Sequence, residues 1–108
     1  MHEMTGRRVG SFDEIELAGD YYIGAIEVDG KSQRQVWFLL PTHEGADKFD
    51  RPTRGSGLHG VPEPPWVFRE CDDGSVEIRA SILCGAREAE GEYFHGFLDE
   101  GHHWRWGI

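Results

Sequence analysis

The chain has 108 residues and a net charge of −9, and 38% of its residues are hydrophobic. This length leaves room for one domain, and the apolar content is typical of a soluble globular fold and too high for a disordered chain. The longest apolar run, residues 36–40, is far shorter than the roughly 20 residues that a membrane-spanning helix needs. No apolar stretch follows the arginines of residues 1–14, so we expect no signal peptide and a cytoplasmic protein.

The net negative charge and the amino-acid composition limit the kinds of ligand and fold that this protein can have. A strongly negative field repels phosphate, so we expect no direct binding to nucleic acid or to an anionic membrane. The same field suits a basic protein partner, or mimicry of nucleic acid toward a basic site. Fifteen glycines, five prolines and four tryptophans indicate a turn-rich β protein. The two cysteines, Cys71 and Cys84, are expected to be small buried side chains and not a disulfide.

Residues 11–17 allow two interpretations. Ser11 followed by Glu14 has the spacing of a capping box, which would open a short helix. The same residues could instead form a strand whose buried positions are Phe12, Ile15 and Leu17.

A β-hairpin and a long loop are predicted next. Residues 21–28 are β-branched and aromatic, Asp29-Gly30 is a hairpin turn signal, and residues 34–40 form the returning strand. Residues 41–65 contain all five prolines, which remove backbone donors, so we expect a Pro/Gly-rich loop there. This loop is either a tolerated surface insertion or a binding loop with the basic residues Lys48, Arg51 and Arg54.

A second hairpin is predicted from residues 66–71 and 75–84. A three-residue loop closed by Cys71 and Ser75, with Gly74 in the left-handed conformation, brings the apolar positions of both strands to one face. The resulting pairs are Trp66 with Ala80, Phe68 with Ile78, Arg69 with Glu77, and Glu70 with Val76.

A third hairpin is predicted from residues 92–98 and 102–106, with the loop Asp99-Glu100-Gly101 between them. Closure on Leu98 and His102 pairs Phe94 with Trp106 and places Trp104 over Gly96. The predicted buried face consists of Phe94, Leu98, Trp104 and Trp106. The opposite, wetter face consists of Tyr93, His95, Phe97, His103 and Arg105.

Ser81 and His95 are the sharpest candidate pair for chemistry. If strands 75–84 and 92–98 are antiparallel neighbours, pairing Ile82 with Phe94 matches their apolar faces and sets Ser81 directly opposite His95. A register shifted by two residues would instead set Tyr93 or Phe97 opposite Ser81. Directly opposed Cβ atoms lie roughly 5 Å apart, close enough for a neutral imidazole to accept the serine proton.

A catalytic serine and histidine need a third group that orients the imidazole ring. Glu77, Glu92 and Asp99 are the candidate acids, and the sequence does not choose among them. The alternative interpretation is a serine and a histidine on the solvent-facing side of a sheet, without catalysis. No Gly-x-Ser-x-Gly motif is present to expose the serine.

Cofactor signatures are missing from the sequence. It contains no P-loop, Gly-x-Gly-x-x-Gly, His-Glu-x-x-His or Cys-x-x-Cys motif, so we expect no cofactor and no metal. The alternative we weighed is a metal site formed by Cys84, His95 and a histidine of the 41–65 loop.

A series of short motifs lies along residues 66–106: WVF (66–68), DGSV (73–76), ASI (80–82), YFHGFL (93–98), DEG (99–101) and Trp104. This pattern resembles a small family of bacterial and phage proteins catalogued mainly as a domain of unknown function. Some members occur in bacterial ubiquitin-like conjugation operons, and the resemblance implies a serine-type peptidase that acts on ubiquitin-like protein tails. By position it places the family's serine on Ser81 and its histidine on His95. The family's proline before that serine is Ala80 here, and its cysteine-rich stretch before the tryptophan is missing.

We therefore expect residues 1–108 to form a single small all-β domain, an antiparallel sheet, open barrel or meander of hairpins with about five to seven strands. Its function is expected to be that of a serine peptidase or hydrolase acting on a protein tail. The alternative is a non-enzymatic phage accessory or anti-defence module whose acidic surface binds a basic protein. A second copy of the chain could cover the sheet edges and give a homodimer.

Overall fold

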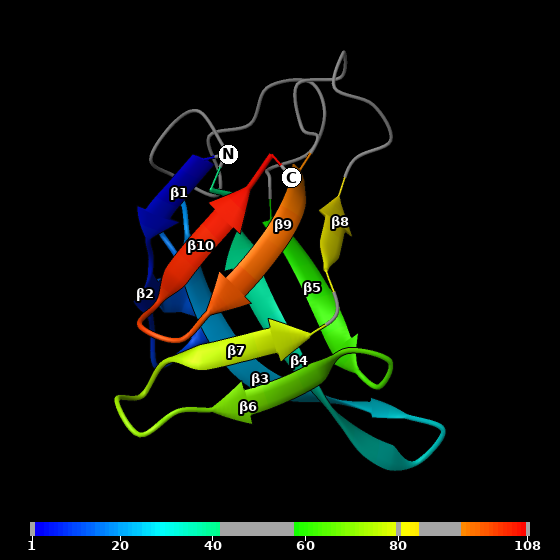
Figure 1. The fold of residues 1–108 in the computed structure, drawn as a ribbon. Helices are drawn as coiled ribbons and strands as arrows, with labels where there is room; N and C mark the ends of the chain where they lie inside the picture. Colours follow the sequence, from blue (N-terminus) through cyan, green and yellow to red (C-terminus); the bar gives the residue numbers. More distant parts are fainter. Residues whose placement is uncertain (1, 42–57, 80, 85–93, 108) are drawn as a thin grey trace, which may run out of the picture.

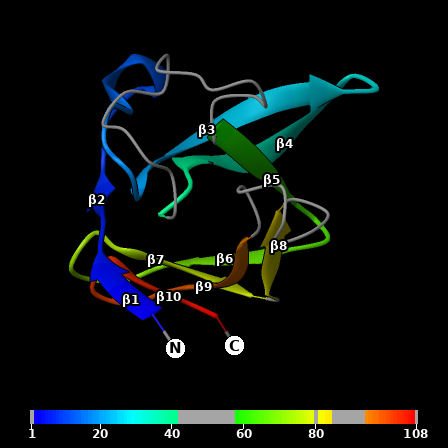
Figure 2. The ribbon, with the colours of Figure 1, turned by 90° about the horizontal axis from the view of Figure 1, so that it is seen from above.

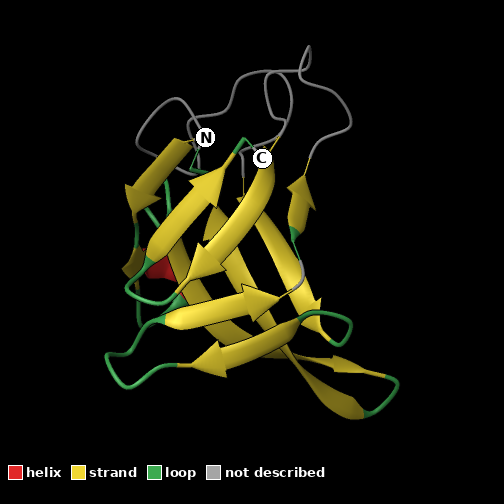
Figure 3. Ribbon diagram, in the orientation of Figure 1, coloured by secondary structure: helices red, strands yellow, loops and turns green. Residues whose placement is uncertain are grey.

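The computed structural model describes residues 2–41, 58–79, 81–84 and 94–107, and these residues form an all-β fold (Figure 3). The only helical element among them is one turn of 3-10 helix, η1 (Phe12–Glu14), and none is a helix long and apolar enough to span a membrane. The strands are β1 (His2–Thr5), β2 (Arg7–Arg8), β3 (Asp20–Val28), β4 (Lys31–Leu39), β5 (Leu58–Glu63), β6 (Val67–Glu70), β7 (Val76–Arg79), β8 (Ile82–Cys84), β9 (Phe94–Asp99) and β10 (His103–Trp106).

The strands form two four-stranded sheets and one separate hairpin (Figures 1 and 2). Sheet A has the order β1-β10-β9-β8, sheet B has the order β2-β3-β4-β5, and β6 pairs with β7. All pairings are antiparallel except β2 with β3, which is parallel. None of the sheets formed by the described residues closes into a barrel. The all-β prediction is confirmed, although the described part alone has ten strands.

The main core lies between sheet A, sheet B and the β6–β7 hairpin. It is built from alternate residues of each strand, because successive side chains of a strand point to opposite faces. Trp104 is fully buried at its centre and donates its indole N–H to the carbonyl oxygen of Gly19 at 2.8 Å. The buried residues of this core are Tyr21, Val36, Phe38, Leu40, Val61, Phe68, Val76, Ile78, Ile82, Phe94, Leu98 and Trp104.

Two predicted hairpins are confirmed in register. The β3–β4 hairpin turns at Asp29 and Gly30, whose φ angles of 52° and 76° are those of a two-residue primed turn. The β6–β7 hairpin closes with the Cys71 N–H donating to the Ser75 carbonyl oxygen at 2.8 Å, and Gly74 has φ 85°. Its pairs are Phe68 with Ile78, Arg69 with Glu77, and Glu70 with Val76, as predicted. The predicted partner of Trp66, Ala80, lies outside the described residues.

The predicted register of the β9–β10 hairpin is wrong by two residues. Trp104 pairs with Leu98, and Trp106 pairs with Gly96. The three-residue loop is Glu100-Gly101-His102, and both Gly101 and His102 adopt left-handed φ angles of 84° and 58°. A shift by two residues keeps every side chain on its predicted face, so the faces alone could not reveal it. Phe94, Leu98 and Trp104 are buried as expected.

The predicted 41–65 loop contains a strand. Its residues Leu58–Glu63 form β5, which pairs with β4 at the edge of sheet B. Pro62 is tolerated there because an edge strand has one side without a hydrogen-bonding neighbour. Residues 42–57, with Lys48, Arg51 and Arg54, lie outside the described residues.

The two interpretations of residues 11–17 are resolved in favour of a single helical turn. Phe12–Glu14 forms η1, and the Ser11 hydroxyl donates to the Glu14 carboxylate at 3.1 Å. Ile15 is fully buried, whereas Phe12 and Leu17 are exposed.

Candidate functional site

Ser81 and His95 are not directly opposed. Strand β8 pairs with β9 so that Leu83 lies opposite His95, and Ile82 lies opposite Gly96. This is the alternative register, shifted by two residues from the expected one. If the pairing continues one position beyond Ile82, Phe97 lies opposite Ser81. The physical reason lies at Gly96, which has no side chain and is flanked by the large Ile82 on one neighbouring strand and Trp106 on the other.

Ser81 and His95 lie on a partly solvent-exposed face of sheet A. Both residues are half-buried, and Leu83 beside them is 60% exposed. The Ser81 carbonyl oxygen accepts a hydrogen bond from the Trp66 indole at 3.2 Å. Within the part of the chain that the structure describes, the His95 imidazole has no hydrogen-bond partner. The diagonal relation implies Cβ atoms roughly 7–8 Å apart, so a serine–imidazole hydrogen bond would require both side chains to lean together.

Two candidate orienting acids are held by arginines. Glu77 pairs with Arg69 through one carboxylate oxygen and with Arg79 through the other, the latter at 2.9 Å. Asp99 pairs with Arg79 at 3.1 Å and with Arg105. Neither acid is hydrogen-bonded to His95, and the third candidate, Glu92, lies outside the described residues. The acids belong to an alternating ion-pair network across β6, β7, β9 and β10.

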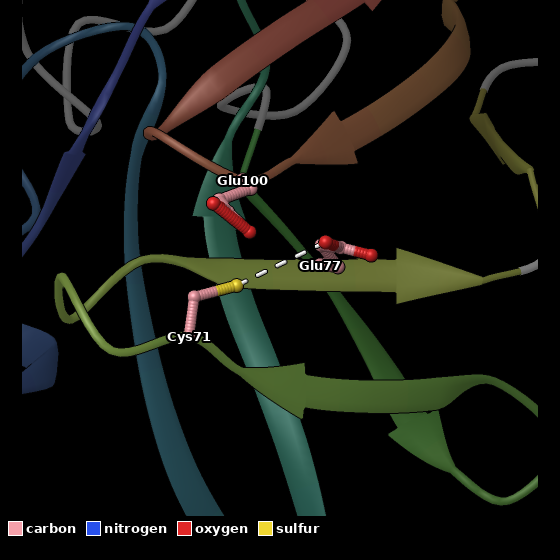
Figure 4. Close-up of side chains that lie close together, drawn as sticks. All are labelled: Cys71, Glu77 and Glu100. Carbon is pink, nitrogen blue, oxygen red and sulfur yellow. Dashed lines mark hydrogen bonds between the residues drawn. The ribbon is translucent and has the colours of Figure 1, made fainter.

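Cys71, Glu77 and Glu100 bring three possible metal-ligand atoms within 4.8 Å of one another (Figure 4). The Cys71 Sγ atom lies 4.0 Å from a Glu77 carboxylate oxygen. Arg69 already neutralises this group, because its guanidinium pairs with Glu77 and lies 3.4 Å from Glu100. The arrangement is that of a surface ion-pair network, in which the arginine already pairs with both carboxylates. The other candidate metal set depends on Cys84, whose side chain is outside the described structure.

A partly buried polar contact joins strand β3 to the distant β9–β10 turn, and the sequence contained no signal for it. The Tyr21 hydroxyl lies 2.6 Å from the His102 Nδ1 atom, although the two residues are 81 positions apart. Tyr21 is fully buried, and this burial raises the pKa of its phenol to about 12. The pair fastens β3 to the β9–β10 turn.

Ser75 connects two turns. Its backbone N–H donates to the Asp73 carboxylate at 2.9 Å, and its hydroxyl also donates to Asp73 and accepts the Gly101 N–H at 2.9 Å. These hydrogen bonds from Ser75 lower the pKa of Asp73. Ser75 is fully buried, so its hydroxyl links the β6–β7 and β9–β10 turns and is not exposed to a substrate.

Asp20 anchors the segment that carries η1. Its side chain is only 2% exposed and accepts two hydrogen bonds from Arg7, at 3.2 and 2.7 Å. The same carboxylate accepts the backbone N–H groups of Glu16 and Leu17, each at 3.0 Å. The hydrogen bond to Asp20 raises the pKa of Arg7. A charged group with this many partners fixes the path of residues 15–17 against sheet B.

The arginines of the described residues are all neutralised within the protein. The pairs are Arg7 with Asp20, Arg8 with Glu70, Arg34 with Glu63 and Glu70, Arg69 with Glu77 and Glu100, Arg79 with Glu77 and Asp99, and Arg105 with Asp99. A second group of carboxylates is exposed and makes no salt bridge with a described residue, although Arg7 attracts Glu14 and Glu16 at longer range. These are Asp13, Glu14, Glu16, Glu27, Asp29 and Asp72.

The exposed acids lie on turns or beside them. Asp13 and Glu14 belong to η1 and Glu16 follows it, whereas Glu27 and Asp29 lie at the tip of the β3–β4 hairpin. Asp72 lies in the β6–β7 turn, and both hairpin tips lie at the lower end of the molecule as drawn in Figure 1. Turn tips project from a sheet, so these charges are presented to solvent.

Comparisons with protein-family models, with curated proteins and with solved structures gave no match. The resemblance of residues 66–106 therefore stays a prediction from sequence motifs.

Proposed function

We propose that this chain is a non-catalytic interaction module that binds a basic protein partner through the exposed acids of its turns. The observation that carries the proposal is the division of its charges. The arginines of the described residues make internal ion pairs, whereas the carboxylates of η1 and of the β3–β4 and β6–β7 turns make no salt bridge with a described residue. The exposed Lys31 also lies at the β3–β4 turn. A protein of net charge −9 with this arrangement attracts a positively charged surface.

The test is the affinity for a lysine-rich peptide, measured by calorimetry as the salt concentration rises from about 50 to about 400 mM. The triple variant Asp13→Asn, Glu14→Gln, Glu16→Gln is expected to bind about tenfold more weakly at low salt, since three attractive charges are lost. The matched control Asp13→Glu, Glu14→Asp, Glu16→Asp keeps the charge and should bind like the parent protein. Affinity that neither salt nor the triple variant changes would contradict the proposal.

A second candidate function is a serine hydrolase that acts on a protein tail, with Ser81 as nucleophile and His95 as base. One observation favours it: the His95 imidazole makes no hydrogen bond within the described part of the chain. In a neutral ring the nitrogen without a hydrogen can then accept a proton. The motif resemblance at residues 66–106 points to the same two residues. Bound substrate would have to bring the diagonal pair together.

A fluorophosphonate probe tests this candidate. Intact-mass spectrometry at pH of about 7–8, where imidazole is largely neutral, should show one adduct that is lost in Ser81→Ala and reduced in His95→Gln. Ser32→Ala, which changes an exposed serine on β4, is the matched control and should keep the adduct. An adduct that survives Ser81→Ala, or no adduct at all, would count against the hydrolase.

A further inference from the structure

The chain contains two Asp-Gly sequences, and each lies in a tight turn between paired strands. Asp29-Gly30 joins β3 to β4, and Asp73-Gly74 lies in the β6–β7 turn. Both aspartates are exposed to solvent. The backbone nitrogen that follows an aspartate can attack its side-chain carboxyl group, and glycine hinders this attack least because it has no side chain. The two turns therefore offer the same reaction in different surroundings.

Hydrogen bonds hold the reacting groups of Asp73-Gly74. The Asp73 carboxylate accepts the Ser75 N–H at 2.9 Å and also the Ser75 hydroxyl. The Gly74 N–H, which contains the attacking nitrogen, donates to the Cys71 carbonyl oxygen at 3.0 Å. The hydrogen bonds from Ser75 also lower the pKa of Asp73, so the protonated carboxyl group, which loses water most readily, is scarce. Reaction at this turn therefore requires several hydrogen bonds to break at once.

Asp29-Gly30 lies at the tip of a ribbon with only two strands. Strand β5 pairs with β4 from residue 34 onward, and within the described part of the chain no third strand pairs with residues 26–33. Residues 27–32 are all exposed, and Figures 1 and 2 both show this tip projecting beyond β5. A two-stranded ribbon is marginally stable in water, so the tip opens locally at a small cost in free energy.

The contacts of Asp29 differ from those of Asp73. The Asp29 side chain makes no hydrogen bond or salt bridge with a described residue. Its φ angle of 52° is in the left-handed region, which is unfavourable for a residue with a side chain, and opening of the turn relieves this strain. The carboxyl group of Asp29 can therefore reach the Gly30 nitrogen without breaking a set of side-chain hydrogen bonds first.

We propose that Asp29 is a site of spontaneous covalent modification, at which Asp29-Gly30 rearranges through a succinimide to isoaspartate while Asp73-Gly74 is protected. The Gly30 backbone nitrogen bonds to the Asp29 side-chain carboxyl carbon and closes a five-membered ring. The amide hydrogen and the carboxyl OH leave as one molecule of water. Water then opens the ring: attack at the side-chain carbonyl restores aspartate, and attack at the backbone carbonyl gives isoaspartate. The water lost is regained, so the mass is unchanged and no other reactant is needed.

Isoaspartate would change the β3–β4 turn. Its main chain runs through the side-chain CH2 group and carries one more atom, whereas the register of a hairpin depends on the length of its turn. The carboxylate is kept but moves to the former backbone position. This inference goes beyond the proposed function and does not depend on it, because it concerns a covalent change of the chain and not the binding of a partner.

The test is a long incubation of the full chain at neutral pH and physiological temperature, followed by tryptic digestion. Trypsin places Asp29 and Asp73 in separate peptides, residues 9–31 and 70–79, and electron-transfer fragmentation identifies isoaspartate in each. Isoaspartate should form at least about tenfold faster at Asp29 than at Asp73, because the hydrogen bonds of Asp73 raise the barrier there.

The matched control is the same chain unfolded in urea. Both aspartates should then react at similar rates, because glycine follows each of them and the folded contacts are lost. Absence of isoaspartate at Asp29 in the folded protein would overturn the inference, as would a rate at Asp73 that is equal or higher. An equally large difference between the two sites in the unfolded chain would also overturn it.

Variants separate the two halves of the inference. Asp29→Glu should abolish the signal in residues 9–31, because the six-membered imide of glutamate forms far more slowly; a signal that persists would place the modification elsewhere. Ser75→Ala should speed isoaspartate formation at Asp73, whereas Ser32→Ala, an exposed serine of the β3–β4 tip, should change neither rate. An unchanged rate at Asp73 in folded Ser75→Ala would overturn the protection. If Ser75→Ala does not fold, the comparison of the folded and unfolded parent protein still decides.

Discussion

The buried phenol of Tyr21 makes the stability of the fold depend on pH in the alkaline range. Its phenol is fully buried and contacts His102 Nδ1, and burial places its pKa at about 12. An unfolded chain exposes this phenol, whose pKa is then about 10. The folded state therefore holds the proton more tightly than the unfolded state does. The stability that this gives is complete below pH 10 and is lost as the pH rises toward 12.

The first prediction is an alkaline loss of stability that Tyr21→Phe removes. Between pH of about 10 and about 12, the free energy of unfolding of the parent protein should fall by about 3 kcal/mol because of this one group. Tyr21→Phe cannot ionise and should lose about that much less over the same range, although it starts about 1 kcal/mol lower because the hydrogen bond to His102 is gone. Urea unfolding at a series of pH values measures both curves. Parallel curves for the two proteins would show that Tyr21 ionises equally in both states.

At the scale of elements, the β6–β7 hairpin is held to sheet B by side chains in place of a strand ladder. Glu63 on β5 accepts the Phe68 N–H at 2.7 Å, and Arg34 on β4 donates to the Phe68 carbonyl oxygen at 3.2 Å. Arg34 and Glu63 also pair with each other at 2.7 Å. Desolvation raises the pKa of Glu63, but the hydrogen bonds from Phe68 and Arg34 outweigh it, and the net pKa is lowered.

The second prediction concerns Glu63→Gln and acid. Because the pKa of Glu63 is lower in the folded state, its contribution is present above the unfolded value of about 4.3 and is lost as the pH falls through the folded value. Glu63→Gln should cost about 1–2 kcal/mol at neutral pH and should flatten the loss of stability on acidification. Chemical unfolding at neutral and acidic pH measures this. Glu27→Gln, an exposed carboxylate on β3, is the control and should change stability by less than about 0.5 kcal/mol.

The third prediction tests the packing of sheet A at Gly96. A Cβ atom there would lie 2.2 Å from the Arg105 carbonyl oxygen and 2.8 Å from the Trp106 Cβ atom. The carbonyl oxygen belongs to the backbone and the Trp106 Cβ atom is bonded directly to it, so neither can move aside alone. Gly96→Ala should therefore destabilise the protein by about 3 kcal/mol or more and widen the β9–β10 pairing. Thermal unfolding compares it with Gly10→Ala, where the nearest atom would lie 3.5 Å away. Equal stability of the two variants would mean that Gly96 does not set the register.

Local turn chemistry decided which elements could be predicted. Asp29-Gly30 and the loop closed by Cys71 and Ser75 fixed two registers, because their turn types demand particular residues at fixed positions. The β8–β9 and β9–β10 registers each moved by two residues, and a two-residue shift leaves the buried face unchanged. That shift separated Ser81 from its expected place opposite His95.

The features missed by the sequence depend on tertiary contacts. Strand β5 was not predicted because its segment contains proline, which an edge strand tolerates. The Tyr21–His102 contact joins residues 81 positions apart, and no local sequence pattern predicts such a pair. The division of charges was equally invisible, because a sequence gives the number of arginines and acids but not which of them meet.

For the whole molecule, we propose that the net charge and the placement of the charges together favour a basic partner. The chain carries 20 acidic residues against 11 lysines and arginines, and its described arginines all face carboxylates of their own fold. Among the described residues, the exposed carboxylates that make no salt bridge lie on or beside η1 and at the β3–β4 and β6–β7 turns. A basic partner would approach along this field and dock where the turns project.

The most direct test of this claim is amide chemical-shift mapping by NMR as a lysine-rich peptide is added to the full chain. We expect the largest shifts on residues 13–16, on residues 27–29 at the β3–β4 tip and on Asp72, and we expect them to shrink as salt is added. Shifts confined to the outer face of sheet A around Leu83 and His95, and insensitive to salt, would contradict it.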